Sequence, residues 1–119
     1  CSMQRDERAY LWDIVDACKA IESLTAEVEL QDYLVSRPLR SAVEREFITV
    51  GEATAALSRA GSPFFSRLTD GPRIVAFRNQ LTHEYQHTDD QVVWQVARDE
   101  VPVLRRECEA LLAEAGDAD

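Results

Sequence analysis

The chain has 119 residues, of which 45% are hydrophobic and 29% charged, as in an ordinary globular protein with a single hydrophobic core. No apolar run approaches the roughly 18 residues of a membrane helix, so no membrane partner is expected. The net charge of −9 argues against a protein that coats nucleic acid without specificity.

The cysteines indicate the compartment. Cys1, Cys18 and Cys108 are an odd number at wide spacing, which fits neither a disulfide framework nor a zinc site. No basic-then-apolar leader marks the sequence for export. We therefore expect reduced thiols with a packing role, and a cytoplasmic location.

The charge is unevenly distributed along the chain. Residues 37–83 contain seven Arg and four acidic residues, a balance of +3, so the remainder carries −12. Twelve of the 13 basic residues are Arg, whose planar guanidinium suits phosphate. The basic middle predicts a local phosphate site, although Arg-rich composition explains it equally well.

The first half of the chain predicts three helices. Apolar residues recur every three or four positions over about 5–24, and a shorter helix is expected over 27–35. Ser36 is the expected cap of a third helix that has Pro38 in its first turn and ends at Ala60. Gly51 in the middle of that helix costs roughly 1 kcal/mol relative to Ala, which indicates the close approach of another helix.

The second half predicts a loop followed by further helices. Gly61, Ser62 and Pro63 end the third helix, and a loop with two Phe follows. A fourth helix is expected to begin at Asp70-Gly71-Pro72. Thr88 with Gln91 is a capping-box pattern for the next helix.

The last predicted helix is interrupted. Pro102 should break it, with Asp99 as the candidate cap of its second piece and Gly116 at its end. The sum is an all-α, up-and-down bundle of about five helices. We expect one domain over 1–119, with a frayed acidic tail at about 115–119.

Both histidines of the chain lie in one segment that contains two overlapping motifs. His83-Glu84-Tyr85-Gln86-His87 matches H-E-x-x-H, in which two His on a helix bind zinc and Glu84 acts as base. No third His is present, and the helix is expected to fray near His87, which would spoil the spacing. We therefore expect no metal site and no cofactor.

The second motif is Arg-x4-His-x-Tyr, formed by Arg78, His83 and Tyr85. At about 100° per residue, Arg78 and Tyr85 share one face of a helix, whereas His83 lies about 140° from Arg78. One helix therefore cannot easily direct Arg78 and His83 at a single atom. Two copies facing each other across a twofold axis can, which predicts a homodimer with a composite cleft.

The segment Arg78-Asn79-x-x-x-His83-x-Tyr85 resembles the signature of HEPN-domain proteins, specifically the HepT-like toxins. Three further patterns of the family are also present in this chain. Family members tend to begin with Arg-x-Tyr-Leu-x-Asp-Ile, to have a run like Ile-Gly-Glu-Ala in mid-chain, and to have a Trp and then a Pro-Leu stretch after the His and Tyr. The matching segments are Arg8–Ile14, Val50–Ala53, Val93-Trp94 and Val101–Leu104. One departure is Glu84, where the family commonly has Gly; it places a carboxylate next to the His of the motif.

The resemblance implies a HEPN-like fold and a function. HepT-like proteins are dimeric, metal-independent ribonucleases that pair with a minimal nucleotidyltransferase antitoxin, which adds AMP to the motif tyrosine. By matching positions, Arg78 and His83 would be catalytic, Asn79 supporting and Tyr85 the AMP acceptor. The partners implied are an RNA substrate, a second copy and the nucleotidyltransferase.

The residues fit this chemistry, and simpler roles stay open. RNA supplies its own 2′-hydroxyl nucleophile, His83 can accept the proton and Arg78 can bind the phosphate. Asn79 could orient the imidazole by a hydrogen bond. Glu52 is expected to pair with Arg78 or Arg73 as plain structure. The alternative function, favoured by Glu84 and the net charge, is a non-catalytic HEPN-like partner of a nucleotidyltransferase that binds nucleotide or substrate.

Overall fold

The computed structural model describes residues 6–83 and 89–116, and within them the chain forms seven helices and no strand. In chain order they are α1 (Glu7–Thr25), α2 (Leu30–Val35), α3 (Arg37–Arg59), α4 (Pro63–Arg67), α5 (Gly71–Thr82), α6 (Asp90–Asp99) and α7 (Val101–Glu114). The predicted all-α class is confirmed. The predicted features at Cys1, at 84–88 and at the last three residues of the acidic tail lie outside the described residues.

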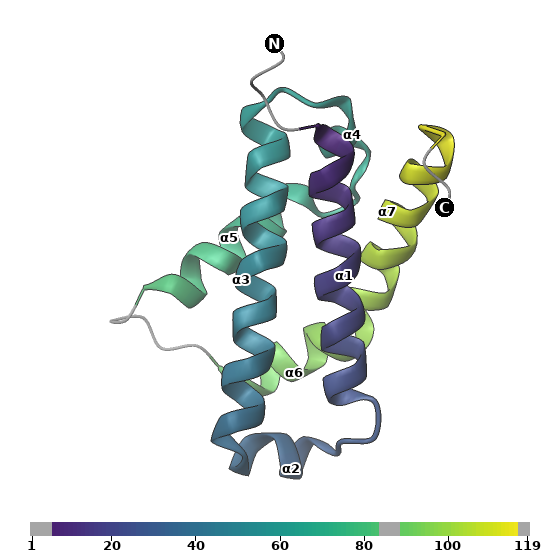
Figure 1. Cartoon of the computed structure of the whole chain (residues 1–119). Coiled ribbons are helices and arrows are strands. Elements are labelled where there is room, and N and C mark those ends of the chain that lie inside the picture. Colours follow the sequence, from purple (N-terminus) through teal and green to yellow (C-terminus); the bar gives the residue numbers. More distant parts are fainter. Residues whose placement is uncertain (1–5, 84–88, 117–119) are drawn as a thin grey trace.

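Three long helices build the core. α1 and α3 run side by side in opposite directions, and α7 packs on the other side of α1 (Figure 1). The side chains they bury against one another are almost entirely aliphatic and recur every three or four positions. Among these buried side chains are Leu11, Ile14, Val15, Ile21, Val43, Phe47, Leu57, Leu111 and Leu112. None of the described helices is both long and apolar enough to span a membrane.

The start of α3 is the one that the sequence predicted. The side chain of Ser36 accepts a hydrogen bond from the backbone N–H of Leu39 at 3.3 Å, and Pro38 lies in the first turn, where its missing N–H has no cost. Beyond the end of the helix, Gly61 has a φ of +66°, a conformation that L-residues with a side chain rarely adopt. Together these two signals fix both ends of the helix that carries Gly51.

Two local predictions were wrong in detail. The predicted loop after Pro63 contains the short helix α4, because the side chain of Ser62 accepts from the N–H of Phe64 and caps it. The cap of the last helix is Glu100 and not Asp99, which still belongs to α6. The predicted break at Pro102 is confirmed, since α6 ends at Asp99 and α7 begins at Val101 with Pro102 in its first turn. With this break and the added α4, the described residues form seven helices, where about five were expected.

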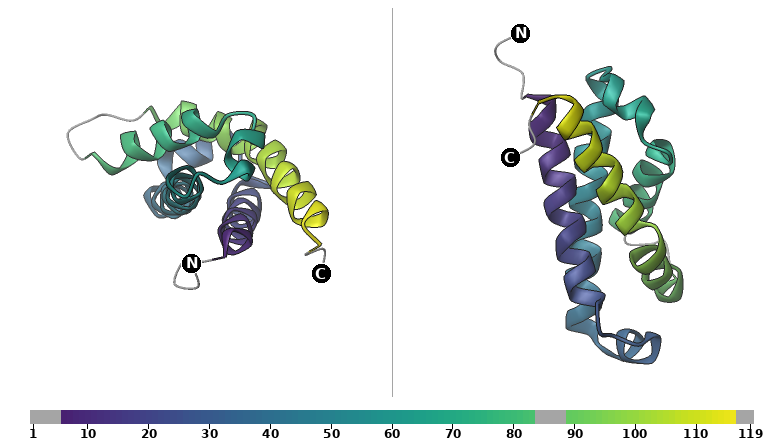
Figure 2. Two further views of the ribbon diagram at one scale, coloured as in Figure 1. Left: turned by 90° about the horizontal axis from the view of Figure 1, so that it is seen from above. Right: turned by 90° about the vertical axis from the view of Figure 1, so that its right-hand side faces the viewer.

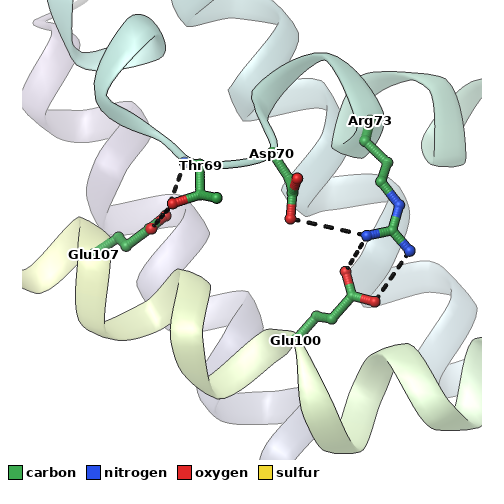
Figure 3. A network of polar contacts seen from close by, with 5 residues as sticks. All are labelled: Thr69, Asp70, Arg73, Glu100 and Glu107. Carbon is green, nitrogen blue, oxygen red and sulfur yellow. Dashed lines mark hydrogen bonds and ion pairs between the residues drawn. The ribbon is translucent and has the colours of Figure 1, made fainter.

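α5 leaves the bundle and crosses α3. Seen from above, α1 and α3 are viewed nearly end-on, while α5 lies across α3 and points away from the bundle (Figure 2). Polar contacts fix its N-terminal end to α6 and α7 (Figure 3). Arg73 binds Glu100 through two hydrogen bonds of 2.7 and 3.0 Å, and Thr69 donates from its backbone N–H and its hydroxyl to Glu107. The helix that carries Arg78 is thus anchored at its start and free to extend outward at its end.

Candidate functional site

The crossing of α5 over α3 is set by a glycine. A Cβ placed on Gly51 would lie 2.1 Å from Cβ and 2.5 Å from Cγ of Arg78, far inside van der Waals contact. Only glycine lets the two helix backbones come this close. The predicted approach of a second helix at Gly51 is confirmed, and the residue that approaches is Arg78 of the motif.

The Arg78 side chain is half-buried, with 28% of its surface exposed. One terminal nitrogen donates a hydrogen bond to Oδ1 of Asn79 at 2.7 Å, and the other lies 4.0 Å from a carboxylate oxygen of Glu52. Its Nε is buried and has no hydrogen-bond partner among residues 6–83 and 89–116. The guanidinium is therefore held by a hydrogen bond to Asn79 and lies within ion-pair distance of Glu52. The loose ion pair with Glu52 is the pairing predicted for that residue, while Arg73 instead binds Asp70 and Glu100.

A cavity of about 370 Å³ opens beside Arg78, between α1 and α3, and we refer to it as the Arg78 cavity. Its wall contains two carboxylates, two guanidiniums, one phenol and one hydroxyl. The lining residues are Tyr10, Asp13, Thr49, Glu52, Ala53, Ala56, Arg59 and Arg78. The two acids and two bases cancel formally, so the cavity is polar without carrying a net charge. Its volume lies in the range of about 300–1,000 Å³ that small-molecule sites occupy.

His83 lies at the exposed end of α5 and not inside the helix. The last helical residue is Thr82, and His83 has φ −93° and ψ 111°, an extended conformation. The prediction that Arg78 through Tyr85 share one helix is therefore wrong at His83, and the 140° separation calculated for an ideal helix does not apply. His83 therefore does not lie within a helix, as the first His of H-E-x-x-H would.

The other predicted site residues divide into two groups. Asn79 is exposed and its described side-chain partner is Arg78, so it positions the guanidinium; the predicted bond to the imidazole is not among the described contacts. Glu84, Tyr85 and His87 lie outside the described residues. Within the described ranges, no three His, Cys, Asp or Glu side chains gather as a metal site would require.

The comparisons with known proteins identify the family. Residues 14–111 match the model of the family described as "Ribonuclease HepT-like". The chain belongs to the HepT-like ribonuclease family. The matched range includes Gly51, Arg78 and His83, and so covers both helices that meet at the site.

Curated relatives match over almost their full lengths. A Thermococcus cleftensis protein named a probable ribonuclease HepT is 30% identical over 112 residues, which is 92% of this chain and 98% of the relative. A Methanocaldococcus jannaschii protein provisionally named RNase MJ1380 is 26% identical over 108 residues, covering 89% and 96%. No solved structure matches this chain significantly.

Sequence reasoning missed the residues that line the cavity from α1 and from the end of α3. Tyr10 packs against the core and also lines the Arg78 cavity, together with Asp13 and Arg59. The available signal was the spacing of Tyr10 and Asp13, three apart on one face of a helix. Their meeting with Glu52 depends on the packing of α1 against α3, which no local pattern encodes.

Proposed function

We propose that this protein is a metal-independent endoribonuclease toxin, with Arg78 and His83 as its catalytic residues, acting as a homodimer in the cytoplasm. The observation that carries the proposal is the contact of Arg78 with Gly51. A family-motif arginine is fixed at a glycine of the long helix and opens onto a polar cavity. The close approach sets the position of α5 on α3, and with it the point from which the Arg78 guanidinium reaches the cavity.

The proposed reaction is an intramolecular displacement at phosphorus. The RNA 2′-hydroxyl attacks the adjacent phosphate, the bond to the 5′ oxygen breaks, and the products carry a 2′,3′-cyclic phosphate and a 5′-hydroxyl. His83 accepts the proton of the 2′-hydroxyl on an unprotonated ring nitrogen, and the departing 5′ oxygen takes its proton from water. Arg78 binds the phosphate oxygens and stabilises the charge that develops on them, with Asn79 holding its guanidinium.

The homodimer is proposed to complete the site. Arg78 is fixed within its own subunit, whereas His83 is exposed where α5 ends. A second copy that meets this end of α5 would bring its own Arg78 or His83 into the same cleft.

Regulation is proposed to act at Tyr85. A minimal nucleotidyltransferase would add AMP to its hydroxyl, two residues after His83 in the sequence. The added phosphodiester is negatively charged and the adenosine is bulky, so both would oppose binding of an RNA phosphate beside Arg78. Silencing of this kind needs no unfolding of the bundle.

The first test is RNA cleavage in a buffer that contains EDTA. Cleavage should persist and leave cyclic phosphate ends, and Arg78→Ala and His83→Ala should each lower it by about 10²–10⁴-fold. His87→Ala is the matched control and should have a mild effect. Inhibition by EDTA together with a severe His87→Ala defect would favour zinc chemistry. A folded wild-type protein that cleaves no RNA but binds the nucleotidyltransferase would favour the non-catalytic partner.

The second test distinguishes a composite site from one contained in a single subunit. Arg78→Ala and His83→Ala proteins are mixed under conditions that let subunits exchange. If each site takes Arg78 from one subunit and His83 from the other, mixed dimers contain one intact site, and about a quarter of wild-type activity returns. A mixture as inactive as its components would refute the composite site.

A further inference from the structure

We infer that the Arg78 cavity binds a nucleobase of single-stranded RNA next to the cleaved phosphate, with Glu52 as the residue that selects guanine. This inference rests on the proposed ribonuclease function and adds the substrate preference of the same site. It starts from position: Arg78, the proposed phosphate-binding group, forms part of the cavity wall. A phosphate bound to Arg78 therefore places its own nucleotide at the mouth of this cavity.

The cavity offers what a flipped-out base requires. Sequence-specific binding of single-stranded RNA uses an aromatic side chain that stacks on the base and polar groups that meet its Watson–Crick edge. Tyr10 provides an aromatic ring from α1, and Glu52 and Asp13 provide carboxylates from two helices. Arg59 lines the same cavity one turn beyond Ala56 and can bind a neighbouring phosphate.

The carboxylates decide which base fits. An ionised carboxylate only accepts hydrogen bonds, so the part of the wall formed by Glu52 favours a base edge made of donors, while the two guanidiniums of the same wall are assigned to phosphates. Guanine presents two adjacent donors, N1–H and the N2 amino group, which a single carboxylate can accept together. Uracil presents one N–H between two carbonyl oxygens, which a carboxylate repels. Adenine and cytosine each offer one amino group, so their binding to the carboxylate should be weaker than that of guanine and stronger than that of uracil.

Glu52 is the better placed of the two acids to select the base. It is 59% exposed, and its carboxylate lies 4.0 Å from the nearest guanidinium nitrogen of Arg78, too far for a tight hydrogen bond. Its oxygens therefore keep accepting capacity for a ligand. When Arg78 binds a phosphate, this loose ion pair gives way and the carboxylate can turn to the base of the same nucleotide.

The first experiment reads the base preference during cleavage. A random single-stranded RNA pool is cut, and the new ends are sequenced. Guanine should be enriched at one position that flanks the cut, and kcat/KM should be higher for an oligonucleotide with guanine there than for its uracil counterpart. Glu52→Gln should lower that ratio by about tenfold, because an amide presents a donor and an acceptor in place of two acceptors.

Two other variants separate base selection from general effects. Glu46→Gln removes one negative charge from the same helix outside the cavity, and should leave the guanine-to-uracil ratio unchanged. Arg59→Gln should weaken cleavage of both oligonucleotides to the same degree, as expected of a phosphate contact. Equal use of all bases at the positions around the cut, or an unchanged ratio in Glu52→Gln, would overturn the inference.

The second experiment does not depend on cleavage, and so distinguishes failure of this inference from failure of the proposed function. GMP and UMP are titrated into the protein by NMR. GMP should bind more tightly and shift the amide resonances of residues that line the cavity, and Glu52→Gln should remove the difference. Equal binding of GMP and UMP to the wild-type protein would refute a guanine site even if RNA is cleaved.

Discussion

Gly51→Ala tests how much of the site depends on the crossing of α5 over α3. The new methyl carbon would lie 2.1 Å from Cβ of Arg78, whereas unstrained carbons approach to about 3.5 Å. The clash involves Cβ, which no rotation of the side chain can move away. α5 must therefore retreat from α3 by about 1.4 Å, taking the guanidinium with it.

The effect on stability should be small and the effect on activity large. Overpacking costs about 1–3 kcal/mol, but Ala is the better helix former by about 1 kcal/mol, which leaves a net loss of about 0–2 kcal/mol. A displacement of a catalytic group by about 1 Å can lower a rate by about 10²-fold. The prediction is a folded dimer with close to normal urea unfolding and severely reduced RNA cleavage.

The controls isolate the contact between the two residues. Ser41→Ala makes a helix-favouring change at an exposed position of α3, and should leave cleavage unchanged. In an Arg78→Gly background the Cβ of residue 78 is absent, so the cost of Gly51→Ala to stability should shrink or change sign. A Gly51→Ala protein that gains about 1 kcal/mol of stability and keeps its activity would refute the reasoning.

Three further predictions concern regulation, burial and anchoring. Tyr85→Phe should retain much of the ribonuclease activity but resist inactivation by the nucleotidyltransferase and ATP; AMP found by peptide mass spectrometry on another tyrosine would contradict this. Burial raises the pKa of Cys108 from 9.0 to about 12 and also raises that of Cys18, so neither thiol should react with iodoacetamide until the protein is placed in concentrated urea. Because unfolded thiols ionise near pH 9, their contribution to stability is complete below that pH and should be lost as pH rises from about 9 to 12. Arg73→Gln should lower the free energy of unfolding by about 0.2–1 kcal/mol, because the ion pair between Arg73 and Glu100 is exposed. Urea unfolding measures this loss. A loss above about 2 kcal/mol would contradict the prediction and show that this ion pair holds α5 more strongly than an exposed pair should.

The sequence predicted those features that depend on neighbours along the chain. Ser36, Pro38 and Gly61 carry start and stop signals, and α3 begins and ends where they indicate. Gly51 predicted a close helix because glycine is costly within one. The sequence could not show that Arg78 is the residue that approaches Gly51, because this depends on how α5 crosses α3.

The end of α5 shows where local patterns fail. No Gly or Pro follows Thr82 closely, so periodicity alone extended the helix through His83 to Tyr85. The Arg78 cavity could not be predicted from the sequence for a different reason. Asp13 and Glu52 are distant in sequence, and only the packing of α1 on α3 brings them to one wall.

The two catalytic residues that we propose are held in different ways, and this difference bears on how the enzyme can be controlled. Arg78 is fixed by the backbone of α3 beneath it and by Asn79 beside it, so its position belongs to the folded subunit. His83 follows the last turn of α5 and is exposed, so its environment can be completed from outside the subunit. In the proposed mechanism, a second copy would meet this exposed end of α5, and the nucleotidyltransferase would modify Tyr85, two residues after His83 in the sequence. Activity can therefore be switched there without disturbing the crossing at Gly51 that positions the phosphate-binding arginine.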